Sequence, residues 1–225
     1  MKAMILAAGR GERMRPLTDQ MPKPLLKIGE QSLIERHLQA LARAGVSEVV
    51  VNLSWLGHMI CEALADGARF GLRIHYSEEG PVPLETAGGI FRALPLLGPE
   101  AFIVVNGDIF TDFPFSTLQL PAAASAHLVL VDNPPQHAQG DFGLEDGHIV
   151  VTSANMHTFS GIAIYRPDFF AGCVPGRFPL LPLFRRAIAM RTLSGELYSG
   201  QWSDVGTPQR LAELQALSPT IDSPS

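Results

Sequence analysis

A glycine- and arginine-rich loop near the N-terminus contains the first residues whose types and spacing could do chemistry. Residues 9–16 read Gly-Arg-Gly-Glu-Arg-Met-Arg-Pro and directly follow a short apolar run. Glycines after a buried strand let backbone N–H groups cradle a phosphate, and the three arginines add charge for a polyphosphate. A bare glycine turn is the alternative, because Met14 replaces the third glycine of a dinucleotide fingerprint and the Gly-Lys-Ser/Thr of a P-loop is absent.

Lys23 is a second candidate for a phosphate contact. It lies between Pro22 and Pro24, which stiffen the backbone and keep the lysine out of a helix. Ten residues separate it from Arg13, enough for the chain to return to the same site. A solvated surface lysine is the alternative interpretation.

Two aspartates lie in segments that could face bound phosphates. Asp108 ends the run Val-Val-Asn-Gly-Asp at the predicted carboxyl edge of a strand. Its Asn-Gly pair also favours a hairpin, but no alternating strand is evident after Asp108. Asp204 precedes Val-Gly-Thr-Pro, where a lone aspartate is more typical of a turn or a helix cap.

The elements that must position these side chains alternate between strand and helix in the first half of the chain. Apolar and β-branched runs predict strands over 2–7, 47–53, 72–77 and 101–106. Capping residues and helical spacing predict helices after Ser32, Ser54 and Thr86, with a capping box from Ser32 to Glu35 and a C-terminal cap at Gly45. Because parallel strands need crossover connections, this order predicts a parallel sheet.

The second half of the chain is less regular. It contains predicted strands over 126–131 and 159–165, a tight hairpin around Asp146-Gly147, and helices over 180–190 and 207–217. We therefore expect an α/β fold, with one Rossmann-like mixed, mainly parallel sheet and helices on both faces. It forms a single domain over residues 1–217, and residues 218–225 form a disordered tail.

Composition excludes several classes of partner. The 225 residues carry a formal net charge of −5, which gives no reason to expect nucleic acid. Cys61 and Cys173 are too few for a disulfide scaffold, and the seven histidines show no zinc-like spacing. No apolar window reaches the length of a membrane span or a signal-peptide core, so we expect a cytoplasmic protein without a membrane partner.

The segment over residues 5–29, ILAAGRGERMRPLTDQMPKPLLKIG, resembles the signature of the sugar-1-phosphate nucleotidyltransferases. The motif is long and specific. The resemblance implies one mixed α/β domain with a nucleotide-binding, Rossmann-like sheet. It also implies an enzyme that joins a nucleoside triphosphate to a sugar 1-phosphate and releases pyrophosphate.

The resemblance assigns roles to individual residues. It implies Arg13 and Lys23 as catalytic cations, and Asp108 and Asp204 as ligands of a Mg²⁺ cofactor. It implies nucleotide contacts from Ala7, Ala8, Gly9, Gly11, Glu79, Thr86 and Gly88, with Glu78 as the alternative to Glu79 for reading the base. It implies sugar contacts from Asn106, Gly143 and Ser160.

The run Glu-Thr-Ala-Gly-Gly over residues 85–89 points to a subgroup, because most of the family has glycine before Thr-Ala. With the short chain, it implies UTP and N-acetylmuramate 1-phosphate as substrates, in recycling of the bacterial cell wall. We expect a monomer or a small homo-oligomer. Two alternatives stay open: a GTP- or CTP-dependent transferase acting on mannose or heptose 1-phosphate or phosphocholine, and a non-catalytic regulatory domain that binds nucleotide sugars.

Overall fold

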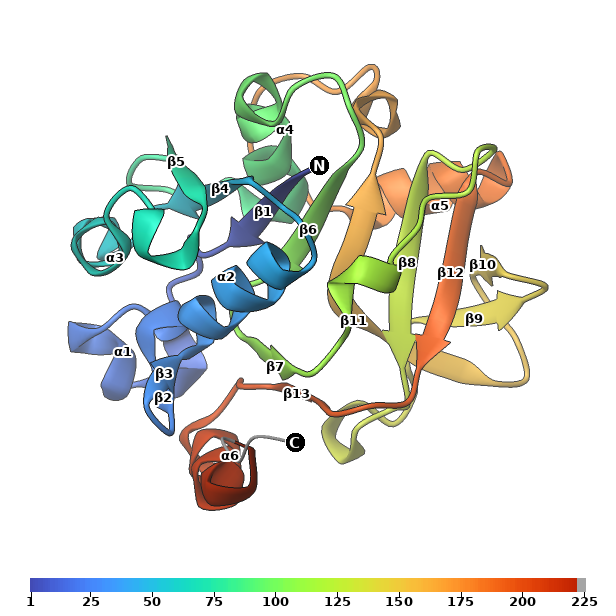
Figure 1. Ribbon diagram of the computed structural model, residues 1–225. Helices are drawn as coiled ribbons and strands as arrows, with labels where there is room; N and C mark the ends of the chain where they lie inside the picture. The colour runs from blue at the N-terminus through green and yellow to red at the C-terminus, as the bar shows by residue number, and fades with distance from the viewer. Residues whose placement is uncertain (222–225) are drawn as a thin grey trace.

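Four parallel strands form the first half of the sheet. In the computed structural model, which describes residues 1–221, these strands are β1 (Lys2–Leu6), β4 (Glu48–Leu53), β5 (Arg73–Glu78) and β6 (Phe102–Asn106). They lie in the order β5-β4-β1-β6 (Figure 1). The crossovers contain helices α2 (Leu33–Arg43), α3 (Gly57–Leu64) and α4 (Glu85–Leu97), as the sequence predicts.

Helices cover both faces because side chains alternate along each strand. Ala3 and Ile5 of β1 point into one apolar cluster, which α2 and α3 complete. Met4 points into the cluster on the opposite face, which α4 and α5 (Leu181–Ala189) complete. Strands buried on both faces read as continuous apolar runs, which is why these were recognisable in the sequence.

The second half of the sheet is mixed and curls back on itself. β11 (Met156–Tyr165) lies antiparallel beside β6. The order continues β8 (Ala126–Val131), β12 (Leu193–Tyr198), β10 (His148–Val150) and β9 (Phe142–Glu145), and β9 then pairs with β11. These five strands therefore close into a small barrel beside the parallel half. The predicted hairpin is confirmed, since Asp146 and Gly147 both have positive φ between β9 and β10.

Two short strand pairs lie outside the main sheet. β2 (Lys27–Ile28) pairs with β3 (Gln31–Ser32), and β7 (Ile109–Thr111) pairs with β13 (Trp202–Asp204). No alternating strand follows Asp108, but the short strand β7 does, and it pairs with β13, so the hairpin that Asn-Gly favours does not form. A third apolar cluster joins these pairs to α6 (Pro208–Ile221) and contains Met14, Leu26, Ile28, Leu33, Phe110, Val205, Leu211 and Leu214.

The predicted helix ends are partly right. The Ser32–Glu35 capping box is present, and Gly45 follows α2 with a φ of 82°. Neither Ser54 nor Thr86 caps a helix, because α3 begins at Gly57 and α4 begins at Glu85, one residue before Thr86. Helix α6 begins at Pro208 and continues to Ile221, so residues 218–221, expected in a disordered tail, are helical. Residues 222–225 of that tail lie outside the described residues.

The remaining elements are short. Helix α1 spans Leu17–Gln20, and 3₁₀ turns span Glu12–Met14, Lys23–Leu25, Ala68–Phe70, Phe115–Thr117, Pro135–His137 and Pro167–Phe170. Within residues 1–221, none of the helices combines the length and apolar character needed to cross a bilayer.

Candidate active site

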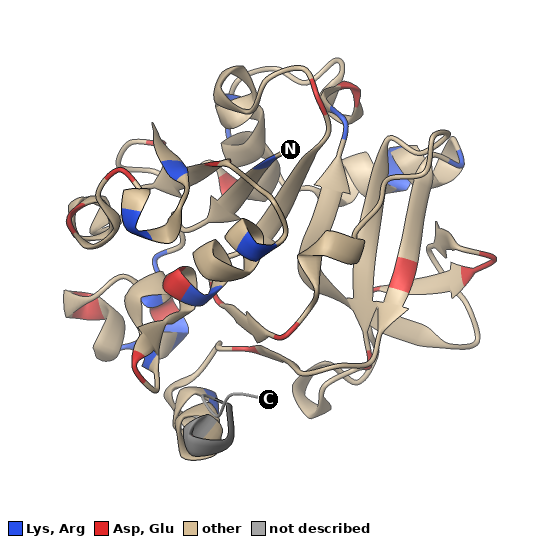
Figure 2. Ribbon diagram, viewed as in Figure 1, with Lys and Arg blue, Asp and Glu red and all other residues tan. Residues whose placement is uncertain are grey.

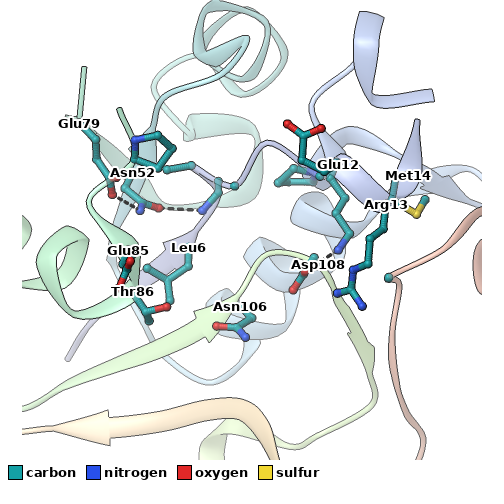
Figure 3. A pocket seen from close by; sticks show the side chains of 18 residues that line it. Leu6, Glu12, Arg13, Met14, Asn52, Glu79, Glu85, Thr86, Asn106 and Asp108 are labelled. Atoms are coloured by element: carbon teal, nitrogen blue, oxygen red, sulfur yellow. Dashed lines mark hydrogen bonds and ion pairs between the residues drawn. The ribbon is translucent and has the colours of Figure 1, made fainter. Parts of the chain in front are cut away.

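A cleft of about 370 Å³ lies at the carboxyl ends of β1 and β6 (Figure 3). This is the edge where open α/β sheets bind ligands. The residues predicted from sequence that line it are Ala7, Ala8, Gly9, Gly11, Arg13, Lys23, Glu79, Thr86, Asn106 and Asp108. Sequence reasoning did not select these further lining residues: Leu6, Glu12, Met14, Pro24, Asn52, Pro83, Glu85 and Gly206.

Two cations and a carboxylate meet at one end of the cleft. Lys23 is only 7% exposed, and its Nζ forms an ion pair with Asp108 Oδ2. Arg13 lies on the same side of the cleft as Asp108 (Figure 3). Lys23 is the first residue of a 3₁₀ turn, Lys23–Leu25, that begins after Pro22 and contains Pro24, so the expectation that the prolines keep it out of a helix holds only for an α-helix. This end of the cleft suits a polyphosphate, because Lys23 and Arg13 bring two positive charges to it.

The other two arginines of the loop do not line the cleft. Arg10 stacks 3.8 Å above the Trp55 ring and donates to Thr18 O and Asp19 Oδ1. Arg15 pairs with Glu12 and Asp19 at the surface. Acidic and basic residues accordingly lie close together around this loop and α1 (Figure 2). The expectation that all three arginines serve a polyphosphate is therefore corrected to Arg13 alone, since local carboxylates hold the others.

A buried polar chain forms the opposite end of the cleft. Ala7 N donates to Asn52 Oδ1 at 2.7 Å, Asn52 Nδ2 donates to Glu79 Oε1 at 2.6 Å, and Leu84 N donates to Glu79 Oε2 at 2.7 Å. Glu79 is 8% exposed, while Glu78 is exposed. These hydrogen bonds fix the loop that follows β1 to the segment before α4. A polar residue inside the β-branched run of β4 was the signal that could have identified Asn52.

Three predicted ligand contacts lie outside the cleft because their residues serve packing. A Cβ at Gly88 would lie 2.3 Å from Gly176 O, and one at Gly143 would lie 2.3 Å from Ser153 Cβ. Ser160 is buried, and its Oγ donates to Val129 O at 2.6 Å. Next to it, Gly161 has a φ of 83°, and a Cβ there would lie 2.5 Å from Asn106 Nδ2. This bulge therefore supports Asn106, which does line the cleft.

The β7–β13 pair brings the two predicted metal ligands together. Val205 N donates to Asp108 O at 2.9 Å, next to the Asp204–Ile109 pair of the ladder. Asp204 Oδ1 accepts from Arg210 Nη1 and, at 2.8 Å, from Gln136 Nε2. Asp204 Oδ2 faces Gly206, where a Cβ would lie 2.8 Å away. Asp204 is not itself a lining residue, but Gly206 is.

The donor set at this point fits a hard divalent cation that also binds phosphate. Asp108, just before β7, and Asp204, at the end of β13, offer carboxylate oxygens, and each is balanced by one cation, Lys23 or Arg210. Among the described residues, no group of three or more His, Cys, Asp or Glu side chains could hold a metal by itself. A metal here must take further ligands from water and bound phosphates, which is the coordination that Mg²⁺ prefers.

Comparison with known proteins defines the class. A family model described as "Nucleotidyl transferase" matches residues 2–151, two thirds of the chain. The chain belongs to this nucleotidyl transferase family.

The more specific likeness is to curated relatives. The chain is 51% identical to the N-acetylmuramate alpha-1-phosphate uridylyltransferase of Neisseria meningitidis, over 97% of this chain and 98% of that protein. It is 35% identical to the protein of the same name from Caulobacter vibrioides, over 95% of each chain. A mannose-1-phosphate guanylyltransferase catalytic subunit beta from Dictyostelium discoideum is 31% identical, and the match covers 93% of this chain and 62% of that one. The chain is thus a sugar-1-phosphate uridylyltransferase homologue.

Solved structures share the fold. A putative glucose-1-phosphate thymidylyltransferase from Bacillus anthracis, in complex with a sucrose, matches with a TM-score of 0.84 at 20% identity, over 100% of this chain and 98% of that one. HddC from Yersinia pseudotuberculosis, complexed with GMP-PN, matches with a TM-score of 0.75 at 19% identity, over 96% and 98% of the two chains. The predicted α/β fold with a mixed sheet is confirmed.

Proposed function

We propose that this protein transfers a uridylyl group from UTP to N-acetylmuramate 1-phosphate, forming UDP-N-acetylmuramate and pyrophosphate with Mg²⁺. The observation that carries the proposal is the single cleft that Arg13, Lys23 and Asp108 line, with Asp204 held beside it. The 51% identity to a relative named for this reaction supports the substrates. The setting is the cytoplasm, in recycling of the cell wall.

The reaction needs alignment and charge neutralisation rather than a general base. The nucleophile, an oxygen of the sugar phosphate, is already anionic. It attacks the α-phosphorus of UTP, and the bond to the bridging oxygen breaks, so pyrophosphate leaves with the electron pair. The two reacting groups repel each other, and the site must hold them in line. Asp108 and Asp204 would hold a Mg²⁺ ion, which would supply positive charge to the reacting phosphates.

The chain's own cations have separate tasks in this scheme. Lys23 exchanges its ion pair with Asp108 for a contact with the α-phosphate and the sugar phosphate. Arg13 holds the β- and γ-phosphates and stabilises the leaving pyrophosphate. Gly9 and Gly11 also line the cleft, and backbone N–H groups of such a glycine-rich loop can bind phosphate. Together these donors stabilise the charge that develops on the transferring group.

Glu79 supports a preference for one class of base. Each of its carboxylate oxygens accepts one internal hydrogen bond and retains a further lone pair. At the ring nitrogen of the pairing edge, uracil and guanine carry an N–H donor, whereas adenine and cytosine carry an acceptor and donate only from an exocyclic amino group. A carboxylate that faces this ring nitrogen therefore favours the first pair of bases. A guanylyltransferase acting on mannose 1-phosphate is therefore the second candidate, at the lower identity of 31%.

A grid of substrates tests the proposal. Pyrophosphate release is measured for UTP, GTP, CTP and ATP against the 1-phosphates of N-acetylmuramate, mannose, heptose and N-acetylglucosamine, and against phosphocholine, with Mg²⁺. We expect the highest rate with UTP and N-acetylmuramate 1-phosphate. Release only with GTP would establish the second candidate. No release in any combination would indicate a nucleotide-sugar-binding regulatory domain.

A further inference from the structure

The wall of the cleft at the start of α4 contains a residue with an unfavourable backbone conformation. Glu85 lines the cleft and has a φ of 61°, in the left-handed region that glycine tolerates and glutamate does not favour. Strain of this kind persists where surrounding contacts impose it, and it gathers at ligand-binding positions. Glycine would adopt this conformation without strain, so the contacts of the Glu85 side chain are the place to look for a reason.

That side chain holds an arginine, Arg177, which is not itself a lining residue of the cleft. Glu85 Oε1 lies 2.9 Å from Arg177 Nε, on the exposed segment between the 3₁₀ turn at Pro167–Phe170 and α5. Backbone bonds fix the segment in place: Gly88 N donates to Phe178 O, and Phe178 N donates to Leu84 O, both at 3.1 Å. The contact with Glu85 uses Nε alone. The two terminal nitrogens of Arg177, a pair that matches a carboxylate, are left for another acceptor.

The other arginines near the cleft are engaged elsewhere. Arg10 and Arg15 pair with loop carboxylates, and Arg210 pairs with Asp204. Arg13 lies at the phosphate end. Among the described arginines near the cleft, Arg177 is thus the one that is engaged neither at the phosphate end nor by the Asp204 segment. Its side chain is 62% exposed.

We propose that Arg177, oriented by Glu85, binds the carboxylate of the lactyl ether that distinguishes N-acetylmuramate from N-acetylglucosamine. This inference rests on the proposed function. Glu85 alone would repel a substrate carboxylate, and Arg177 beside it neutralises that charge and places guanidinium donors there. Arg177 then selects the sugar without touching the reacting phosphates.

The test is a two-by-two comparison of enzyme and substrate. The substrates are N-acetylmuramate 1-phosphate and its lactyl methyl ester, which keeps the shape and loses the charge. The enzymes are the wild type and Arg177→Gln. In the wild type, esterification lowers kcat/KM by about tenfold or more, which is typical of a charge-assisted hydrogen bond. In Arg177→Gln, kcat/KM for the acid falls to its value for the ester, so the ratio of these two kcat/KM values approaches one.

Two further variants separate recognition from structure. Arg185→Gln removes a positive charge from exposed α5 and should keep the wild-type ratio. Glu85→Gly relieves the left-handed strain, so it should fold at least as well as the wild type by thermal melting. Glu85→Gly should also lower the ratio of kcat/KM for the acid to kcat/KM for the ester, because Glu85 no longer orients Arg177.

The outcomes distinguish the two proposals. If Arg177→Gln lowers kcat/KM equally for acid and ester, Arg177 serves the phosphates or the fold, and this inference is overturned. If the wild type shows no ester effect, the carboxylate is not recognised, and the inference is likewise wrong. If the wild type makes no product from N-acetylmuramate 1-phosphate and UTP, the proposed function itself fails.

Discussion

Three arginines in the glycine-rich loop differ in role because their neighbours differ. Arg10 is held by the Trp55 ring and by Thr18 O, so it fixes the loop to the segment before α3. Arg15 lies in a surface network with Glu12 and Asp19. Arg13 lines the cleft. The sequence shows three equivalent positive charges, and only the tertiary contacts separate them.

Arg13→Gln tests this difference in role, and Arg15→Gln is its control. Removing the cation that we propose for the leaving pyrophosphate should lower kcat by roughly 10²-fold or more, the loss seen when one transition-state donor is deleted. Arg15→Gln removes only exposed ion pairs, which contribute about 0–1 kcal/mol, and should leave kcat within about threefold. Steady-state pyrophosphate release measures both. Equal losses would show that the loop acts through net charge, not through Arg13.

Asp108→Asn tests the metal assignment at the residue scale. The substitution keeps the shape of the side chain and removes the charge that faces Lys23 and the proposed cation. We expect kcat to fall about 100-fold and the Mg²⁺ concentration for half-maximal rate to rise. Isothermal titration of Mn²⁺ onto enzyme with bound UTP gives a readout besides activity.

Asp146→Asn is the matched control for Asp108→Asn. Asp146 lies in the β9–β10 turn with a φ of 48°, which asparagine tolerates. It should change neither rate nor metal binding. A near-normal rate for Asp108→Asn would contradict the assignment.

At the scale of elements, the β7–β13 pair and α6 tie the two ends of the chain together. The third apolar cluster packs Met14, beside Arg13, against Val205, beside Asp204, with Leu211 of α6 completing it. The regular strands and the capping box could be predicted because buried parallel strands and caps have local signatures. β7 and β13 could not, since strands of three residues show no periodicity and their pairing is long-range.

Leu211→Ala tests whether this cluster positions the site. Leu211 is 5% exposed, and the cavity should cost about 2–5 kcal/mol of unfolding free energy. Because it loosens the contact between the Arg13 loop and the Asp204 segment, kcat should also fall by about tenfold. Leu128→Ala creates a comparable cavity in the opposite cluster and should lose stability at nearly unchanged kcat. Urea denaturation and kinetics below the melting range measure the two effects, and equal kcat losses would contradict the account.

At the scale of the molecule, the cleft lies at the carboxyl edge of the parallel half, beside a small barrel. The parallel half and most of the phosphate end could be read from the sequence. The barrel could not, because β12 contains Gly195 and little alternation, and closure depends on β9 returning to β11. Resemblance predicts ligand contacts from Gly88, Gly143 and Ser160, but none of them lines the cleft: backbone or side-chain atoms crowd both glycines, and Ser160 Oγ donates to Val129 O.

One buried group couples the whole fold to pH. His37 of α2 lies beneath β7, 3.0 Å from Ile109 O, and burial lowers its pKa from 6.5 to about 4. Above pH 6.5 the ring is neutral in both the folded and unfolded states. As the pH falls from 6.5 to 4, only the unfolded state gains the proton, so stability drops by about 3 kcal/mol and then levels off.

His37→Gln, which can still donate to Ile109 O, should remove this part of the acid sensitivity. The measurement is urea denaturation at several pH values between 4 and 7, with His58→Gln on the exposed surface of α3 as the control. If His37→Gln leaves the dependence of the unfolding free energy on pH unchanged, His37 titrates normally in the folded protein.

The most direct test of the central claim compares two substrate pairs on one enzyme preparation. The values of kcat/KM are measured for UTP with N-acetylmuramate 1-phosphate and for GTP with mannose 1-phosphate, in Mg²⁺ and then in excess chelator. We predict a ratio of at least about 100 in favour of the first pair, equivalent to about 2.7 kcal/mol of discrimination, and loss of both activities in chelator. A ratio below one, or full activity in chelator, would contradict the account.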